Sequence, residues 1–428
     1  MDTNDLILVS VDDHVVEPPE LFANQLSKAD LERAPKVIHK DDLEADVWTF
    51  EGVEIPNVGL NAVAGRPPEE YGFEPTAFDE IRRGAYDIDE RIRDMNVNGV
   101  LGSMCFPSMP GFCGQLFTRT DDREFGLRLL QAYNNWHIDE WCGSYPGRFM
   151  PLAIAPIWDP QLMAAEVRRV AEKGCHAVAF SENPTKLGYP SFHTDHWDPF
   201  WAACCDTDTV VCMHIGSSST LVSTASDAPI DTLITLQPMN IVLCAADLLW
   251  SPVLRNFPRL RVALSEGGIG WVPYFLERVD YTYRHHKPWT NQDFGDRLPS
   301  EVFNEQILTC FIDDAAGMEV RHHLNGDHIM WECDYPHSDS TWPNAPEMAW
   351  EYLKDLPEDE IHKISHLNAL RAFSFDAFSH VPREEATAGA LRARATDVDT
   401  TLVSYGTGKF KDEGIVTTMT LVERMASR

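Results

Sequence analysis

The sequence predicts an α/β protein built on a TIM (β/α)8 barrel, and two observations support this. Short apolar runs rich in Val, Ile and Leu recur eight times along the 428 residues, and amphipathic helical stretches separate them. Alternating strands and helices predict a parallel sheet with right-handed crossovers, and eight such units predict a closed barrel. The expected strands are residues 6–12, 99–106, 148–157, 176–183, 209–216, 260–268, 307–314 and 328–337.

Each expected strand is a mainly apolar run, and six of the eight end in a polar residue or in glycine. In order, the first four runs read LILVSVD, GVLGSMCF, RFMPLAIAPI and HAVAFSEN. The last four read TVVCMHIG, LRVALSEGG, ILTCFIDD and HIMWECDYPH. Residues 123–143 and 160–174 show the apolar spacing of helices that cover such a sheet on its outer side.

Two regions depart from the repeat. Residues 18–97 form a charged, proline-containing insertion after the first strand, which we expect to cap the barrel mouth. We expect one barrel domain over residues 1–379 and a C-terminal extension over residues 380–428. This extension is expected to pack on a neighbouring subunit of a homo-oligomer or on the outside of the barrel.

Charge and composition exclude several classes of partner. A formal net charge of −32 disfavours nucleic acid and anionic membranes, which would repel the chain. The N-terminus lacks a signal-peptide pattern, and no apolar run has the length expected of a membrane span. The cysteines show no C-x-x-C spacing and several lie in apolar runs, which predicts reduced thiols and a cytoplasmic protein. The glycines of SEGGIG lack the G-x-G-x-x-G spacing, so no nucleotide cofactor is expected.

Ionisable residues gather where the expected strands end. The first strand ends in Asp12 and His14, which alternate and therefore point to one side. Further ionisable residues at strand ends are His214, Glu266, Asp334 and His337. Working groups of such barrels lie at the C-terminal ends of the strands. Any one of these residues can be a structural cap or ion-pair partner, but together they predict a metal site.

Glu17 decides how many metal ions are expected. It follows His14 on a loop stiffened by two prolines, and it is either a metal ligand or a salt-bridge partner at the rim. With Glu17, the ligand set is Asp12, His14, Glu17, His214, Glu266, Asp334 and His337. Four carboxylates and three imidazoles suit two divalent ions, with iron or an iron–manganese pair favoured over zinc. Asp13 is a weaker alternative to Asp12, because the pleat should turn it away.

The motifs VDDHVVEP, CMHIGSS, RVALSEGGIGWVPYFLERVD and WECDYPHSDSTWP resemble those of the amidohydrolase superfamily, in its amidohydrolase-2 branch. The resemblance extends over residues 7–377 and implies a metal-dependent barrel that acts as a hydrolase or a non-oxidative decarboxylase. Asp12 stands where the family has the first histidine of H-x-H, and Glu266 where many members have a histidine. No lysine that could be carboxylated ends the fourth strand, since Lys186 is distant.

With these departures, the sequence is similar to a smaller group in the branch, the dinuclear non-haem iron oxygenases. In that group the extra glutamate, the glutamate after strand six and the histidine after D-Y-P are ligands, and Glu17, Glu266 and His337 match them. We therefore expect a di-iron or iron–manganese monooxygenase that hydroxylates a small organic molecule, with electrons supplied from elsewhere.

A one-metal enzyme is the alternative. One zinc or manganese ion would be held by Asp12, His14, His214 and Asp334, and Asp334 would act as general base in hydrolysis or decarboxylation. His337 and Glu266 would then support the ligands or handle protons. In both schemes Glu266, Asp334 and His337 are the expected catalytic residues. A catalytically inactive barrel is a third possibility, but it predicts a broken ligand set.

The substrate is expected to be a small molecule in a mostly apolar pocket. Aromatic and methionine residues are frequent in the loops that follow the strands. The residues expected to contact the substrate are Asn183, Ser217, Trp271 and Trp342.

Overall fold

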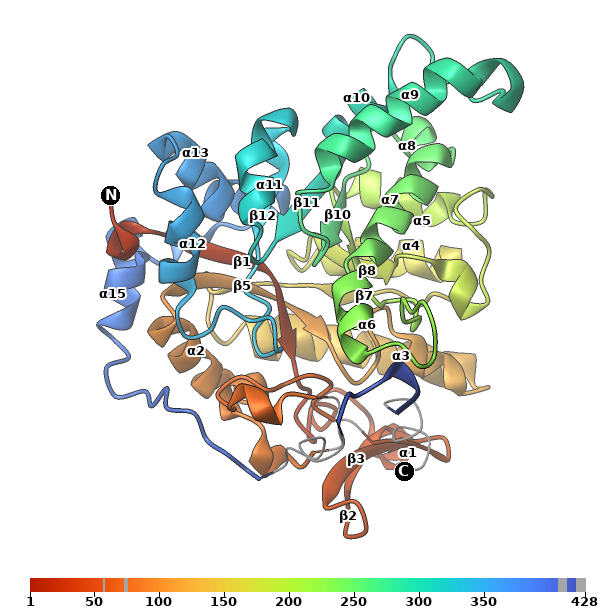
Figure 1. The fold of residues 1–428 in the computed structure, drawn as a ribbon. Coiled ribbons are helices and arrows are strands. Elements are labelled where there is room, and N and C mark those ends of the chain that lie inside the picture. The colour runs from red at the N-terminus through yellow and green to blue at the C-terminus, as the bar shows by residue number, and fades with distance from the viewer. Residues whose placement is uncertain (57, 73–75, 407–413, 421–428) are drawn as a thin grey trace.

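The computed structural model describes residues 1–56, 58–72, 76–406 and 414–420. Its core is a set of buried parallel strands surrounded by helices, as the sequence predicts (Figure 1). The barrel strands are β1 (Leu8–Val15), β5 (Val100–Pro107), β6 (Phe149–Met150), β7 (Ala153–Ile154), β8 (Ala177–Ser181), β9 (Val210–His214), β10 (Val262–Ser265), β11 (Ile307–Phe311) and β12 (Ile329–Trp331).

The third predicted strand is divided into β6 and β7. Pro151 lies between them and has no N–H to continue the hydrogen-bonded ladder. One sheet therefore has the order β1-β5-β6, and the other has the order β12-β11-β10-β9-β8-β7.

The first and last strands close the ring through hydrogen bonds at their C-terminal ends. The Asp334 N–H donates to the carbonyl of Asp12 at 2.8 Å, and the His14 N–H donates to the carbonyl of Tyr335 at 2.7 Å. These bonds bring the two ends of the barrel sequence together beside the expected metal ligands.

The insertion after β1 is shorter than predicted. It contains helix α1 (Lys28–Arg33) and an antiparallel sheet of β2 (Lys36–Lys40), β3 (Ala45–Phe50) and β4 (Val53–Ile55). Residues 88–97, expected to lie in the insertion, instead form α2 (Ile88–Val97), the barrel helix before β5. The side chain of Asp87 accepts N–H groups of residues 89 and 90 and begins this helix, so the insertion ends there.

The other helices follow the strands around the barrel (Figure 1). They are α3 (Arg123–Asn135), α4 (Pro160–Ala171), α5 (Asp198–Asp206), α6 (Ile230–Leu236), α7 (Met239–Trp250), α8 (Val253–Asn256), α9 (Val272–Thr290), α10 (Pro299–Gln306), α11 (Ala315–Val320), α12 (Ala345–Leu353), α13 (Glu358–His362), α14 (Asn368–Ala372) and α15 (Ala388–Arg392).

By length and composition alone, one segment, Ile230–Trp250, resembles a membrane span. It consists of two helices, α6 and α7, that meet at Pro238. Ile241, Cys244 and Leu248 of α7 are buried in the apolar core shared with β9 and β10. Part of the apolar surface of this segment is therefore buried in the protein core.

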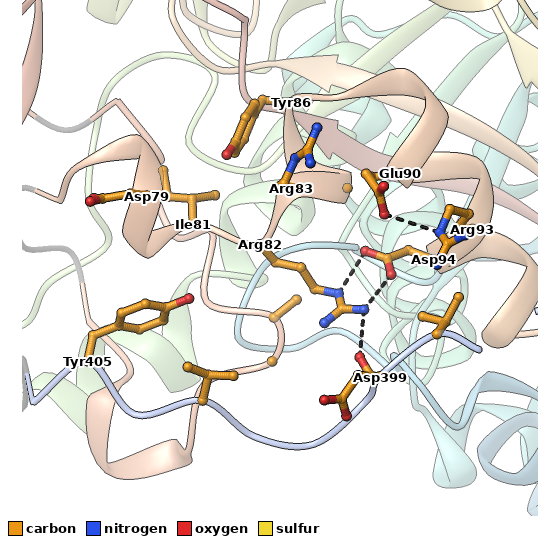
Figure 2. A pocket seen from close by; sticks show the side chains of 15 residues that line it. Asp79, Ile81, Arg82, Arg83, Tyr86, Glu90, Arg93, Asp94, Asp399 and Tyr405 are labelled. Atoms are coloured by element: carbon orange, nitrogen blue, oxygen red, sulfur yellow. Dashed lines mark hydrogen bonds and ion pairs between the residues drawn. The ribbon is translucent and has the colours of Figure 1, made fainter. Parts of the chain in front are cut away.

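The C-terminal extension packs on its own chain. Ala388 and Leu391 of α15 are buried, and the Ala388 N–H donates to the carbonyl of Leu6. Residues 398–405 then border a pocket of about 500 Å³ that the insertion and α2 also line (Figure 2). Further on, the N–H groups of Thr418 and Met419 donate to the carbonyls of residues 228 and 226, in the loop after β9.

An internal histidine lies where α3 passes into a π-helical segment, Trp136–Cys142. His137 is fully buried, and neither ring nitrogen has a hydrogen-bond partner among the residues described. Burial lowers its pKa to about 4, because the imidazolium ion would lose its hydration.

We expect His137 to destabilise the fold in acid. The unfolded chain binds a proton near pH 6.5, but folded His137 does so only near pH 4, so the free energy of unfolding falls as pH drops between these values. From pH 7.5 to 4.5 this contribution amounts to about 2.5 kcal/mol. Urea unfolding at both pH values measures the free energy of unfolding. Between pH 7.5 and 4.5 this free energy should fall by about 2.5 kcal/mol less in His137→Phe than in wild type.

The exposed His285→Phe variant is the control for removing an imidazole. Equal losses of stability in wild type and His137→Phe would contradict the assignment.

Candidate metal centre

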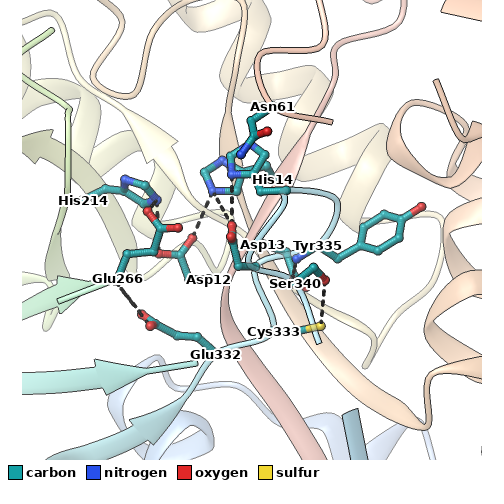
Figure 3. A network of polar contacts seen from close by, with 12 residues as sticks. Asp12, Asp13, His14, Asn61, His214, Glu266, Glu332, Cys333, Tyr335 and Ser340 are labelled. Atoms are coloured by element: carbon teal, nitrogen blue, oxygen red, sulfur yellow. Dashed lines mark hydrogen bonds and ion pairs between the residues drawn. The ribbon is translucent and has the colours of Figure 1, made fainter. Parts of the chain in front are cut away.

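Six of the seven predicted ligands meet at one end of the barrel. Asp12 and His14 are alternate residues of β1, and His214 is the last residue of β9. Glu266 directly follows β10, while Asp334 and His337 follow β12. Figure 3 shows Asp12 and His14 of β1, His214 of β9 and Glu266 after β10 pointing toward one another.

The ligand atoms are within a few ångströms of one another. His14 Nε2 lies 3.5 Å from Asp12 Oδ1 and 3.3 Å from Asp334 Oδ1. His214 Nε2 lies 3.3 Å from Asp12 Oδ2 and 3.2 Å from Glu266 Oε2. Asp12, His14 and His214 form one group able to hold an ion, and His14, Asp334 and His337 form a second.

The donor atoms at the centre fit a divalent cation. Both carboxylate oxygens of Asp12 and Asp334, and Nε2 of both His14 and His214, are buried and accept no hydrogen bond within the described chain. Buried polar atoms normally have a partner, and such atoms converging from three strands are what a bound ion requires. Carboxylate oxygen and imidazole nitrogen together suit manganese, iron or zinc.

The pKa values at the centre also fit a bound divalent cation. Burial, with the neighbouring carboxyls, raises the pKa of Asp12 and Asp334 well above the usual range, and that of Glu266 to about 8. Burial also lowers the pKa of His14 well below its usual range and that of His337 to about 4. Neutral imidazoles are competent ligands, and a divalent ion would supply the positive charge that these carboxylates need to ionise.

Two of these residues leave their strands in a left-handed backbone conformation. Glu266 has φ 56° and Asp334 has φ 57°, values that residues with a side chain rarely adopt. Such strain is typical of functional sites. The side chain of Glu332 holds the first of these turns, because its carboxyl oxygens lie 3.2 and 3.3 Å from the Glu266 N–H.

Hydrogen bonding and aromatic packing orient His214. Its Nδ1 lies 2.7 Å from the carbonyl of Ile215, so Nδ1 carries the proton and Nε2 is free to act as a ligand. The centroid of the Phe112 ring is 4.4 Å from that of His214, and the centroid of Phe106 is 4.8 Å from it. Phe112 is only partly buried, so these two rings form an aromatic wall beside the centre.

Glu17, the seventh predicted ligand, lies outside both groups. Its Oε1 accepts the Ser108 N–H and the Tyr133 hydroxyl, each at 3.0 Å, and its Oε2 accepts the Met109 N–H at 2.7 Å. Burial raises its pKa to about 7, against the effect of the peptide N–H groups. This carboxylate therefore joins β1 to the loop after β5.

Asp13 is directed away from the centre, as the pleat predicts. Its carboxylate accepts the Tyr335 N–H at 2.9 Å and the hydroxyl groups of Ser10 and Ser103.

The four predicted substrate-binding residues have other contacts. The Ser217 hydroxyl lies 2.5 Å from Glu182 Oε2 and 2.7 Å from the carbonyl of His214. The side-chain oxygen of Asn183 accepts a hydrogen bond from the Thr185 hydroxyl. The indole N–H of Trp271 donates to the carbonyls of residues 267 and 268, and Trp342 packs against Arg82. Contact with a substrate therefore stays a prediction for all four.

Sequence reasoning missed Glu332 and Phe112. Glu332 and Asp334 are two residues apart at the end of a strand, so alternation alone places both on one side of it. Phe112 lies in a loop, and the chain pattern does not fix the direction of its ring.

A family model of amidohydrolases matches residues 60–375 of the chain. Gamma-resorcylate decarboxylase from Rhizobium sp. (strain MTP-10005) is 22% identical over 362 residues, which cover 78% of this chain and 99% of that enzyme. These matches agree with the motif resemblance found in the sequence.

Solved structures show the same fold. An amidohydrolase from Mycobacterium avium subsp. paratuberculosis K-10 has a TM-score of 0.65 at 20% identity, over 86% of this chain and 98% of that one. A 5-carboxyvanillate decarboxylase from Novosphingobium aromaticivorans DSM 12444, complexed with manganese and 4-hydroxy-3-methoxy-5-nitrobenzoic acid, has a TM-score of 0.58 at 17% identity. It covers 86% of this chain, and 96% of that chain is matched.

We expect Mn²⁺ to stabilise the wild-type protein and not the Asp12→Asn variant. Ligand that binds only the folded state adds about 2.7 kcal/mol at one hundred times its Kd. Asp12→Asn removes a charged ligand from the centre and should abolish this gain, which thermal unfolding with and without Mn²⁺ will measure. Asp13→Asn is the matched control, because it alters the adjacent carboxylate and should keep the gain. An equal response of the two variants would contradict the ligand assignment.

Proposed function

Because the chain belongs to the amidohydrolase family, we propose that it is a metal-dependent, non-oxidative decarboxylase of a small aromatic acid. The observation that carries the proposal is that Asp12, His14 and His214 form one group of possible metal ligands, that Asp334 joins it through His14, and that the oxygen and nitrogen atoms they present have no hydrogen-bond partner. The relatives reported above, decarboxylases among them, add support.

The four ligand residues supply what one ion needs. A divalent ion bound there would act as a Lewis acid that orients a substrate carboxylate or phenolate and stabilises negative charge on it. The Nδ1–H of His214 fixes its ring, and the αL turn at Asp334 directs that carboxylate toward His14.

Decarboxylation also needs a proton. The bond between the ring carbon and the carboxyl carbon breaks, CO₂ leaves, and the electron pair left on the ring carbon takes up a proton. Glu266 is well placed to donate it from Oε2, which lies 3.2 Å from His214 Nε2. Its side chain is 10% exposed, compared with 1% for Asp334, so a substrate in the mouth can reach it. His337 Nδ1 lies 3.0 Å from Asp334 Oδ1, beside that carboxylate.

The walls beside the centre favour a planar aromatic substrate. Phe106 and Phe112 present ring faces and edges next to His214, and Phe112 is partly exposed. Aromatic rings prefer offset or edge-to-face contacts with other rings. Two of the three reported relatives, the gamma-resorcylate and 5-carboxyvanillate decarboxylases, are named for aromatic acids, which agrees with this choice.

The dinuclear oxygenase expected from the sequence is the second candidate. One observation favours it, since His14, Asp334 and His337 form a second group beside the first. Glu17, however, is engaged by Ser108, Met109 and Tyr133. The relatives give the oxygenase no support, so we place it second.

The oxygen requirement tests the choice of reaction. The Mn²⁺-loaded protein, incubated with 2,6-dihydroxybenzoate, 5-carboxyvanillate and other hydroxybenzoates, should release CO₂ and form the decarboxylated phenol at equal rates under argon and air. Chromatography of the phenol and of any hydroxylated product measures both outcomes. Product that forms only in air, with a gain of oxygen, would favour the oxygenase.

Glu266→Gln tests the proton donor. We expect a loss of activity of about 100-fold or more, because the amide cannot deliver a proton, while the bound metal per chain stays unchanged. If the variant loses its metal, Glu266 is a ligand and the proton comes from another group.

Metal content tests the role of Glu17. Wild type and Glu17→Gln should each contain about one ion per chain, since four protein ligands suit one ion. Elemental analysis of protein purified without chelator and without added metal gives this number. Two iron or manganese ions in wild type, and a loss of one in the variant, would support the dinuclear oxygenase instead.

A further inference from the structure

The two residues between Asp334 and His337 are held at each of their backbone polar groups. Tyr335 donates its N–H to Asp13 at 2.9 Å and accepts the His14 N–H at 2.7 Å. The following carbonyl, that of Pro336, accepts two N–H groups from the insertion at 2.9 Å, those of Val63 and Ala64. The short link between the two residues is therefore tied to β1 on one side and to the insertion on the other.

The Tyr335 side chain continues away from the centre to a buried carboxylate. Its hydroxyl donates to Asp94 Oδ2 at 2.6 Å. Arg82 Nε donates to the same oxygen at 2.8 Å, and Arg82 Nη2 donates to Asp94 Oδ1 at 2.6 Å. Such two-point contacts between guanidinium and carboxylate fix the orientation of both groups.

The C-terminal extension and the loop after β12 hold Arg82 in place. Its Nη2 also donates to the carbonyl of Asp399 at 3.0 Å, as Figure 2 shows. Its guanidinium carbon lies 4.2 Å from the centroid of the Trp342 ring. Glu70 fixes the same stretch of chain by accepting the N–H groups of residues 405 and 406.

A side chain at Gly84 would displace the atoms that surround the Tyr335 hydroxyl. A Cβ atom there would lie 2.2 Å from Asp94 Oδ2 and 2.7 Å from the tyrosine oxygen. The chain thus brings backbone directly against this hydrogen bond, so the hydroxyl has little freedom to move.

We propose that Tyr335, supported by Asp94 and Arg82, is a positioning residue for Asp334 and His337. The backbone of Asp334 is strained, and a loop free to move would relax and carry its carboxylate away from His14. The anchored tyrosine on the next residue opposes this relaxation. The inference rests on the proposed function, because it assigns Asp334 to a metal centre.

Mn²⁺ binding to full-length variants tests the proposal. Tyr335→Phe removes only the hydroxyl, and Arg82→Met removes the support of Asp94. Residues that orient metal ligands typically change affinity by about 10- to 100-fold, and we expect a weakening of that size in both variants. Electron paramagnetic resonance measures free Mn²⁺ and records the spectrum of the bound ion, which should change as well.

Arg83→Met is the matched control. It removes the neighbouring guanidinium, which is 64% exposed and paired with Asp87. Wild-type affinity and an unchanged bound spectrum in Tyr335→Phe and Arg82→Met would overturn the proposal. The double variant should be no weaker than Tyr335→Phe alone, because Arg82 acts through the tyrosine hydroxyl, and additive losses would contradict that route.

Hydrogen exchange of the metal-free proteins separates this inference from the proposed function. Amides of residues 333–338 should exchange faster in Tyr335→Phe and Arg82→Met than in wild type and Arg83→Met. Wild type that binds no Mn²⁺, together with this difference in exchange, would refute the metal enzyme while the restraint on the loop stands. Equal exchange in all four proteins would overturn the restraint.

Discussion

The structure depends on the burial of four carboxyl groups and three imidazoles in one cluster. Asp12, Glu266, Glu332 and Asp334 contribute the carboxyls, and His14, His214 and His337 contribute the imidazoles. Buried charge is unfavourable unless a counter-charge accompanies it. No lysine or arginine side chain forms an ion pair with these carboxyls in the part of the chain that is described. A bound cation would resolve the conflict, and it would also account for the unsatisfied oxygens at the centre of a well-packed barrel.

Hydrogen bonds and aromatic contacts around the cluster keep these carboxyl and imidazole groups in place, although burying them is unfavourable. The Glu332 carboxylate accepts a hydrogen bond from the Glu266 N–H. This bond stabilises the left-handed backbone conformation of Glu266, which residues with a side chain rarely adopt. Glu17 joins β1 to the loop that carries Phe112, which places an aromatic ring beside His214. Acidic residues near the centre therefore differ in their hydrogen-bond partners, and this difference separates the proposed ligands from the residues that hold the backbone around them.

The fold and most of the site were predictable from the sequence, because both depend on regular alternation. Strand periodicity predicted the barrel, and the positions at strand ends predicted that six of the seven candidate ligands would lie together. Glu17 lies on a loop, and its direction follows from contacts with Ser108 and Tyr133, more than ninety residues away in sequence. The same holds for Ser217, whose hydroxyl is taken by Glu182. The expected oxygenase chemistry depended on Glu17, the residue whose direction the strand pattern did not fix.

The hydrogen bonds between Asp12 and Asp334 and between His14 and Tyr335 also bear on how the chain matures in the cell. They join the first strand of the barrel to residues that follow the last one, more than three hundred positions later in sequence. During synthesis, the early half of the centre leaves the ribosome long before the late half, since translation proceeds at about 5–20 residues per second. For tens of seconds the nascent chain carries Asp12 and His14 without their partners. The proposed ion could therefore be captured only late in folding, and contacts so distant in sequence form slowly.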